Sequence, residues 1–92
     1  MKSRILFMGT PDFARASLEA LIAAGADVIG VLTQPDKPRG RKMQLTPSPV
    51  KVCALEHNIP VYQPKTLRDE AFSELLASLA PELIVVAAYG KI

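Results

Sequence analysis

The fold of this chain is constrained most by short apolar segments that recur along it. Three of them are RILFM at residues 4–8, VIGVLT at 28–33 and LIVVAA at 83–88. Runs of this length and composition are typical of strands that are buried on both faces of a parallel sheet. The last run is the most apolar, and we expect it in the middle of the sheet. A shorter strand is predicted at 61–63, between two prolines.

Helical patterns lie between these strands. One helix is predicted at 11–24 with Thr10 as its cap, and another at 49–57 with Ser48 as its cap. A third is predicted at 69–79, where apolar side chains recur at i, i+3, i+4 and i+7. Strands that alternate with helices in this order predict an α/β fold. We therefore expect a Rossmann-like, doubly wound and mostly parallel sheet with four strands, three helices and right-handed crossovers.

The composition is that of one small globular domain. The chain has 92 residues, 49% of them hydrophobic, and a formal net charge of +2. It has a single cysteine and a single histidine, so neither an internal disulfide nor a metal site is expected. The N-terminus lacks the pattern of a signal peptide, and no apolar run approaches the roughly 20 residues that cross a membrane. These features predict a cytoplasmic protein. Because the chain stops directly after its most apolar run, we expect it to be the front portion of a longer protein.

The residues most often used in catalysis are poorly placed for it here. His57 stands near the end of a predicted helix without a neighbouring acid, and is interpreted as a surface or capping histidine. Cys53 lies in the same helix and is interpreted as a small core residue. The sequence therefore shows no catalytic constellation.

The segment PDKPRGRKMQLTPSPVK, residues 35–51, is long for a connection between a strand and a helix. It holds four of the eight prolines and five of the eleven Lys and Arg residues, and no acid follows Asp36 within it. We expect the prolines to keep an inserted basic loop at 35–49 extended and outside any helix or sheet ladder. It is interpreted either as a solvated surface loop or as a stiff arm that carries guanidinium groups to an anionic partner such as a nucleic acid.

In a sheet of this type, ligands bind beyond the carboxyl ends of the strands. Residues 9–13, after the first strand, and 89–92, after the last, are therefore the candidate binding segments. A dinucleotide fingerprint needs a second glycine where Pro11 stands, and a Walker-type phosphate loop is absent from the sequence. Phe13 and Tyr89 each have two interpretations, as core aromatic residues or as walls of a substrate pocket.

Four segments together resemble the N-terminal part of the methionyl-tRNA formyltransferase family, over essentially the whole chain. They are FMGTPDFA (7–14), GVLTQPDKPRGR (30–41), LTPSPVK (45–51) and VVAAYGKI (85–92). The resemblance implies that residues 1–92 are the first part of a Rossmann-like formyltransferase catalytic domain. That family transfers a formyl group from 10-formyltetrahydrofolate to the amino group of methionine on initiator tRNA. Its catalytic Asn, His and Asp lie downstream of Ile92, so the chain by itself is expected to be inactive.

The resemblance also implies roles for individual residues. The tRNA contacts would come from the basic loop, with Arg41 entering the acceptor stem: Lys37, Arg39, Arg41 and Lys42. The aminoacyl end of the substrate would lie against Gly9, Thr10 and Phe13. The folate would meet main-chain groups of Tyr89, Gly90, Lys91 and Ile92. After Arg41 the family often has Gly-Lys-Lys where this chain has Lys42-Met43-Gln44, so the resemblance does not define the contacts of the second part of the loop.

The expected partners are thus initiator methionyl-tRNA and 10-formyltetrahydrofolate, without a metal, DNA or a membrane, in a monomeric full enzyme. Two other hypotheses remain. The parent could be a folate-dependent formyltransferase with a different acceptor, such as a sugar nucleotide. Alternatively, the chain could be an RNA-binding or folate-binding module without chemistry.

Overall fold

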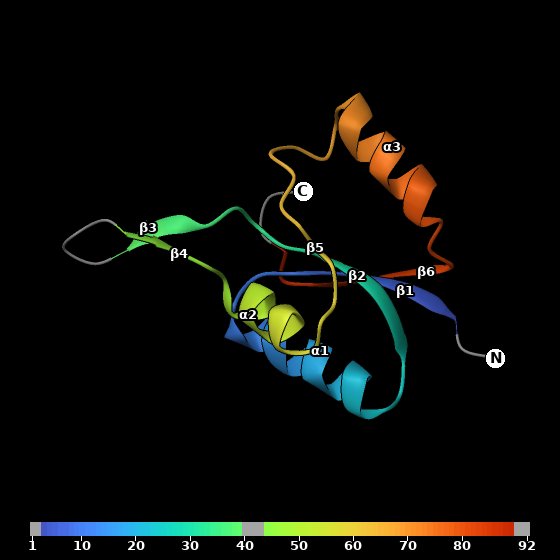
Figure 1. The fold of residues 1–92 in the computed structure, drawn as a ribbon, viewed down its shortest axis with the longest axis horizontal. Coiled ribbons are helices and arrows are strands. Elements are labelled where there is room, and N and C mark those ends of the chain that lie inside the picture. Colours follow the sequence, from blue (N-terminus) through green and yellow to red (C-terminus); the bar gives the residue numbers. More distant parts are fainter. Residues whose placement is uncertain (1–2, 40–43, 90–92) are drawn as a thin grey trace.

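The computed structural model describes residues 3–39 and 44–89. In these residues, strands and helices alternate as the sequence predicts, with two further short strands in the basic loop (Figure 1). The elements are β1 (Arg4–Gly9), α1 (Asp12–Ala23), β2 (Asp27–Leu32), β3 (Lys37–Arg39), β4 (Gln44–Thr46), α2 (Pro49–Glu56), β5 (Val61–Tyr62), α3 (Glu70–Leu79) and β6 (Leu83–Ala87).

Four strands form one parallel sheet in the order β5-β2-β1-β6. Helices α1 and α2 lie on one side of this sheet and α3 lies on the other (Figure 1). The predicted fold class, a doubly wound α/β sheet with three helices, is confirmed. None of the helices formed by the described residues has the length and apolar character needed to span a bilayer.

Alternating side chains of β1 build the two halves of the core. Phe7 is fully buried and packs with residues of α1 and α2, among them Leu18 and Val50. Leu6 and Met8 point to the opposite face, where apolar residues of α3 pack against their cluster. Because neighbouring residues of a strand face opposite sides, one short apolar run supplies both layers. The interpretation of this run as a strand buried on both faces is therefore confirmed.

The helix ends follow local chemistry, with one exception. Ser48 caps α2 by accepting a hydrogen bond from Lys51 N at 3.1 Å, as predicted. Gly25, with φ of 81°, follows the end of α1 in the left-handed conformation that glycine adopts without strain. Thr10 does not cap α1, because Pro11 is the N-cap residue and no side-chain cap is formed. The Thr10 hydroxyl donates a hydrogen bond to Tyr89 O at 2.8 Å instead.

The expectation that the last apolar run lies in the middle of the sheet is wrong for the described chain. In residues 3–39 and 44–89, β6 pairs only with β1, so it forms one edge of the sheet. Leu83, Ile84 and Val86 are each about half exposed, at 52%, 49% and 50%. Apolar composition reports that a strand is suited to burial, but it does not determine which elements flank that strand.

The expectation that the basic loop stays outside any sheet ladder is also wrong. Strands β3 and β4 pair antiparallel, with Pro38 opposite Leu45, and form a separate two-stranded sheet. We call these two strands the hairpin. A proline is tolerated there because each strand of a two-stranded sheet has one side that needs no amide donor. The hairpin extends away from the parallel sheet (Figure 1).

Candidate functional site at the carboxyl ends of the strands

The candidate site lies at one edge of the sheet, where the parallel strands β1, β2, β5 and β6 all end. The first polar residues after these strands are Thr10, Thr33, Gln34 and Gln63, and Tyr89 follows β6. The sequence analysis singled out only Thr10 and Tyr89 among them. A signal for the others was present, since each polar residue directly follows an apolar strand, and this position is where ligands bind in such sheets.

Hydrogen bonds join the loops after β1, β2 and β6. Thr10 Oγ1 donates to Tyr89 O at 2.8 Å and accepts from Gln34 N at 3.3 Å. The side-chain amide of Gln34 donates to the same Tyr89 oxygen at 3.3 Å. The structure therefore brings Thr10, predicted for the aminoacyl end, and Tyr89, predicted for the folate, into direct contact.

Gly9 has a strictly steric reason for being glycine. A Cβ at this position would lie 2.6 Å from Ala14 Cβ and 2.8 Å from Ala87 O. The end of β1 is thus pressed between the start of α1 and the backbone of β6. This close approach permits the tight turn that the sequence predicts after the first strand.

Thr33 links β2 to the start of α2. It is fully buried, and its hydroxyl lies 2.6 Å from Ser48 Oγ. It also donates to Thr10 Oγ1 at 3.5 Å, a longer and weaker contact. Ser48 also caps α2. The contact between Thr33 and Ser48 therefore holds the segment between β4 and α2 against the end of β2.

The two candidate aromatic residues differ in burial. The ring of Phe13 is 73% exposed in the first turn of α1, so its interpretation as a core residue is wrong. Tyr89 is only 2% exposed and packs with Leu6, Met8 and Leu32. Burial raises the pKa of the Tyr89 phenol, so this group stays protonated at neutral pH.

Two hollows border these residues. One has a volume of about 150 Å³ and is lined by Thr10, Asp12, Gln34, Thr46 and Ser48, among others. The second, of about 450 Å³, lies beside Tyr89 and the segment 64–68. Gln34 lines both hollows.

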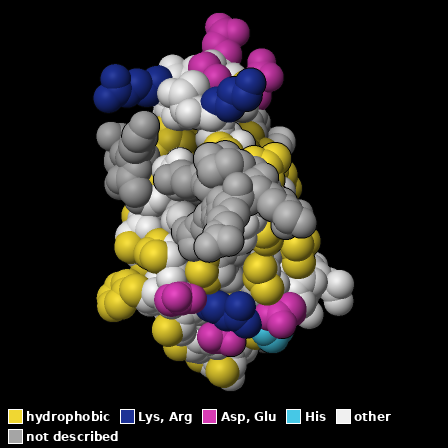
Figure 2. Space-filling view, turned by 90° about the vertical axis from the view of Figure 1, so that its left-hand side faces the viewer, with side chains coloured by type: hydrophobic (Ala, Val, Ile, Leu, Met, Phe, Trp, Pro, Cys, Tyr) yellow, Lys and Arg dark blue, Asp and Glu magenta, His cyan; other side chains and the backbone are white. Residues whose placement is uncertain are grey.

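The predicted tRNA contacts are only partly within the described structure. Lys37 and Arg39 belong to β3, whereas Arg41 and Lys42 lie outside the described residues. Figure 2 views the molecule from the side to which the hairpin points. Hydrophobic side chains appear on this face, with acidic and basic side chains gathered toward its two ends. Leu45, on β4, is 67% exposed. Of the folate segment, Gly90, Lys91 and Ile92 also lie outside the described residues.

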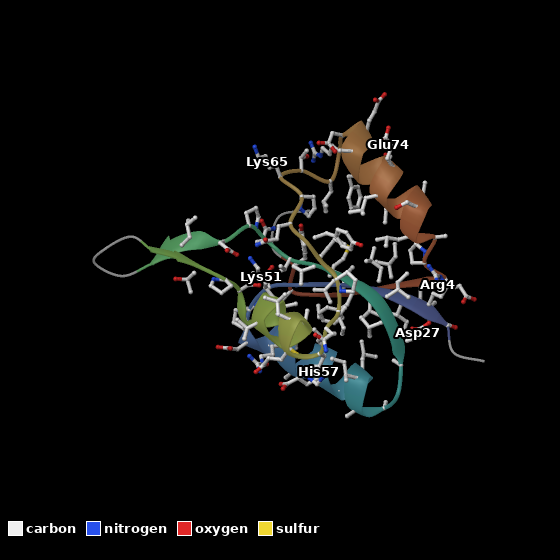
Figure 3. The ribbon with its side chains drawn as sticks, viewed as in Figure 1. Arg4, Asp27, Lys51, His57, Lys65 and Glu74 are labelled. Carbon is white, nitrogen blue, oxygen red and sulfur yellow. The ribbon has the colours of Figure 1, made fainter. Side chains whose placement is uncertain are left out.

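Other groups with possible chemistry lie elsewhere. His57 is exposed at the end of α2, away from the strand ends, as its interpretation as a capping residue requires (Figure 3). Cys53 is buried, and burial raises the pKa of its thiol, with a further contribution from Glu19 and Glu56. Among the described residues, no three His, Cys, Asp or Glu side chains lie close enough together to hold a metal ion.

Comparisons with known proteins cover nearly the whole chain. A sequence model of the formyl transferase family matches residues 1–92. The chain belongs to the formyl transferase family. It is 60% identical over 89 residues to the methionyl-tRNA formyltransferase of Chloroflexus aurantiacus strain J-10-fl, covering 97% of this chain and 29% of that protein. It is 58% identical to the methionyl-tRNA formyltransferases of Desulforamulus reducens, over 89 residues, and Bacillus pumilus, over 91.

The match leaves most of each relative uncovered. The chain covers 97% and 98% of its own length in the matches to Desulforamulus reducens and Bacillus pumilus, but only 28% of each of those two proteins. The chain thus spans less than a third of the length of these relatives.

Proposed function

We propose that this chain is the N-terminal part of the catalytic domain of a methionyl-tRNA formyltransferase. Such an enzyme would transfer the formyl group of 10-formyltetrahydrofolate to the amino group of methionine on initiator tRNA. One observation carries the proposal: identity of 60% over 97% of the chain to a relative that bears this name.

We assign the basic loop, which contains the hairpin, to RNA binding. The proposed contacts are Lys37, Arg39, Arg41 and Lys42, with Arg41 entering the acceptor stem. Arginine suits this role because its planar guanidinium forms two parallel hydrogen bonds with a phosphate and stacks on bases. The position of β3 and β4, extended from the sheet next to the strand ends, supports this assignment.

We assign the loops after β1 and β6 to the two reacting partners. Gly9 and Thr10 would form the wall against which the aminoacyl end lies, and the exposed ring of Phe13 would meet the methionine side chain. Tyr89, Gly90, Lys91 and Ile92 would present main-chain groups to the folate. The hydrogen bond between Thr10 Oγ1 and Tyr89 O supports this, since a transfer reaction needs both partners in adjacent sites.

The remaining parts of the proposal follow from the substrates. Charged initiator tRNA and reduced folate are cytoplasmic, so we place the enzyme in the cytoplasm. We propose that it acts as a monomer and needs no metal, DNA or membrane.

The test uses the full-length protein that contains this chain. Incubated with 10-formyltetrahydrofolate and methionyl initiator tRNA, it should yield formylmethionyl-tRNA. The Arg41→Ala variant should raise the KM for tRNA by roughly tenfold, since one strong phosphate or base contact corresponds to about 1–3 kcal/mol. Arg4→Gln is the control, because Arg4 lies near the opposite end of β1 (Figure 3).

Two results would contradict the proposal. Formylation of a sugar nucleotide with no reaction on methionyl-tRNA would indicate a different acceptor. Tight tRNA binding by the full-length protein without any formyl transfer would instead indicate an RNA-binding module.

A further inference from the structure

The hairpin leaves the sheet at Asp36, and this residue is held by two distant segments. Lys51 Nζ, on α2, lies 3.1 Å and 3.0 Å from the two carboxylate oxygens of Asp36. Gln63 Nε2, just after β5, donates to Asp36 Oδ1 at 2.7 Å. Figure 3 shows Lys51 at the start of α2, beside the base of the hairpin. We call Asp36, Lys51 and Gln63 the clamp.

The clamp continues into the network at the strand ends. Gln63 Nε2 also donates to Gln34 O at 3.2 Å, and Gln34 N donates to Thr10 Oγ1. The chain is therefore held at Gln34 and again at Asp36, between the end of β2 and the start of β3. On the other leg, Ser48 contacts Thr33 two residues after β4 ends. The first leg of the hairpin is thus attached to the segments after β1 and β5 and to α2, and the second leg to the end of β2.

The hairpin needs such an attachment because its own strands cannot orient it. Its two strands form a sheet of their own, separate from the parallel sheet. An isolated two-stranded hairpin is marginally stable in water. Leu45 on β4 is 67% exposed, so it is not seated in the core. The direction of β3 and β4 therefore depends on the contacts at their base.

The ion pair of the clamp is suited to positioning Asp36 rather than to a large gain in the free energy of unfolding. The side chains of Lys51 and Asp36 are 21% and 25% exposed, so the pair is partly solvated. Such a pair contributes little net stability, but its two-oxygen geometry and the added amide donor restrict where Asp36 can lie. The hydrogen bond from Gln63, followed by that from Lys51, lowers the pKa of Asp36 and keeps it ionised at neutral pH.

We propose that Asp36, Lys51 and Gln63 are positioning residues that hold the hairpin in the orientation in which it meets the tRNA, without contacting the RNA themselves. This inference rests on the proposed function. The inference extends that function by placing a determinant of RNA affinity in residues that do not contact the RNA.

The experiment measures the Kd of the full-length protein for methionyl initiator tRNA at several salt concentrations. Asp36→Asn and Lys51→Met should each weaken binding roughly tenfold, and the slope of log Kd against log salt should become shallower by about one per lost phosphate contact. The KM for 10-formyltetrahydrofolate should not change. Lys51→Arg should bind nearly as the wild type, because it keeps the charge.

Glu56→Gln is the matched control. It removes a second ion pair, between Arg15 Nη2 and Glu56 Oε1 at 2.7 Å, that joins α1 to α2 without touching the hairpin. Its Kd should stay within about twofold of the wild type. If Asp36→Asn does not fold, Lys51→Met and Gln63→Leu carry the same test.

Asp36→Asn also separates positioning from direct binding. If Lys51 contacted phosphate itself, releasing it from Asp36 would strengthen tRNA binding, and this result would overturn the clamp. A double-mutant cycle with Arg39→Ala gives a further criterion. If the clamp acts through the hairpin, the double variant should bind no more weakly than the weaker of the two single variants. Losses that add fully would overturn the inference.

The failure of the clamp can be told apart from the failure of the proposed function. If Arg39→Ala and Arg41→Ala weaken binding but Asp36→Asn does not, the clamp is wrong and the RNA role stands. If none of the basic variants changes binding or formylation, the RNA role fails. The clamp is then judged by amide hydrogen exchange in β3 and β4, which should accelerate in Asp36→Asn and not in Glu56→Gln. Equal exchange in the two variants would overturn it.

Discussion

The parallel sheet and the hairpin that leaves it are stabilised by different interactions. In the sheet, Phe7 and Leu18 are fully buried on one face and Leu6 on the other. In the hairpin, Leu45 is largely exposed, and the described contacts at the base are polar. Apolar burial is spread over many residues and does not depend on one geometry, whereas a hydrogen bond or ion pair depends on the position of a few atoms.

This difference indicates which changes each region can tolerate. The sheet should lose stability when volume is added or removed, because its interior is closely packed. When a polar contact at the base of the hairpin is removed, the domain should keep most of its stability, whereas the hairpin should lose its orientation. The candidate site combines the edge of the sheet, where Thr10 contacts Tyr89, with the hairpin. The orientation of the hairpin is set by other contacts, at its base.

The largest effect on stability is expected for Gly9→Ala. Its Cβ would meet Ala87 O at 2.8 Å, and this backbone oxygen cannot move without disturbing the pairing of β1 with β6. We expect a loss of about 3 kcal/mol or more in the free energy of unfolding, measured by chemical denaturation of the full-length protein. Gly30→Ala is the control, since its Cβ would meet only side chains, the ring of Tyr62 at 3.1 Å and Leu6 Cδ1 at 3.5 Å. Equal losses in the two variants would show that the approach of β6 does not limit Gly9.

A single substitution made in both regions tests the comparison directly. Leu18→Ala, in the core, should reduce the free energy of unfolding by about 2–5 kcal/mol, because it leaves a cavity. Leu45→Ala, in the hairpin, should change it by less than about 0.5 kcal/mol. The measurement is again chemical denaturation. A large loss for Leu45→Ala would show that the hairpin packs against the rest of the domain.

A smaller effect on stability is expected for the clamp itself. Because the ion pair is partly solvated, Lys51→Met should lower the free energy of unfolding by less than about 1 kcal/mol. The same variant should weaken tRNA binding roughly tenfold, which is a larger effect in free energy, about 1.4 kcal/mol. Thermal unfolding and filter binding on one preparation compare the two. If stability fell by several kcal/mol instead, the clamp would be part of the core and the contrast between the regions would fail.

The smallest effect near neutral pH concerns the charge of Asp36. Its pKa is lowered in the folded protein, so its contribution is present above the unfolded value of about 3.9 and is lost as pH falls through the lower folded value. Between pH 6 and 8 the contribution of the clamp should not change. The carboxyl resonance of Asp36 should titrate below the pH range that is ordinary for an aspartate. Amide hydrogen exchange in β3 and β4, corrected for its intrinsic rate, should accelerate only in that acidic range. In Asp36→Asn this acid transition should be absent.

Much of the fold was predictable because the relevant signals are local. The apolar runs predicted the four strands of the parallel sheet, and Ser48 predicted the start of one helix. The prediction that Thr10 caps the first helix was wrong. Its sequence context is that of a helix cap, but Tyr89, distant in sequence, offers its hydroxyl a stronger partner.

The candidate site was predicted as two segments, but not as a connected network. Gln34 and Lys51 lie in segments that carry the family resemblance, but no local pattern assigns them a partner. The contacts of Lys51 and Gln63 with Asp36, and of Gln63 with Gln34, join segments far apart in the chain. The pairing of β3 with β4 was missed because prolines argue against strands, and the tolerance for proline at an edge appears only when the partner strand is known.

By itself, the sequence determined where the helices and the strands of the parallel sheet form, the basic character of the segment between β2 and α2, and the relationship to formyltransferases. These properties depend on neighbouring residues and on composition, which any chain carries before it folds. Only the tertiary structure decided that β6 lies at an edge of the described sheet, that Phe13 is exposed, and that Asp36 is held by Lys51 and Gln63. Those outcomes depend on which distant segments meet, and side-chain polarity along the chain does not specify that.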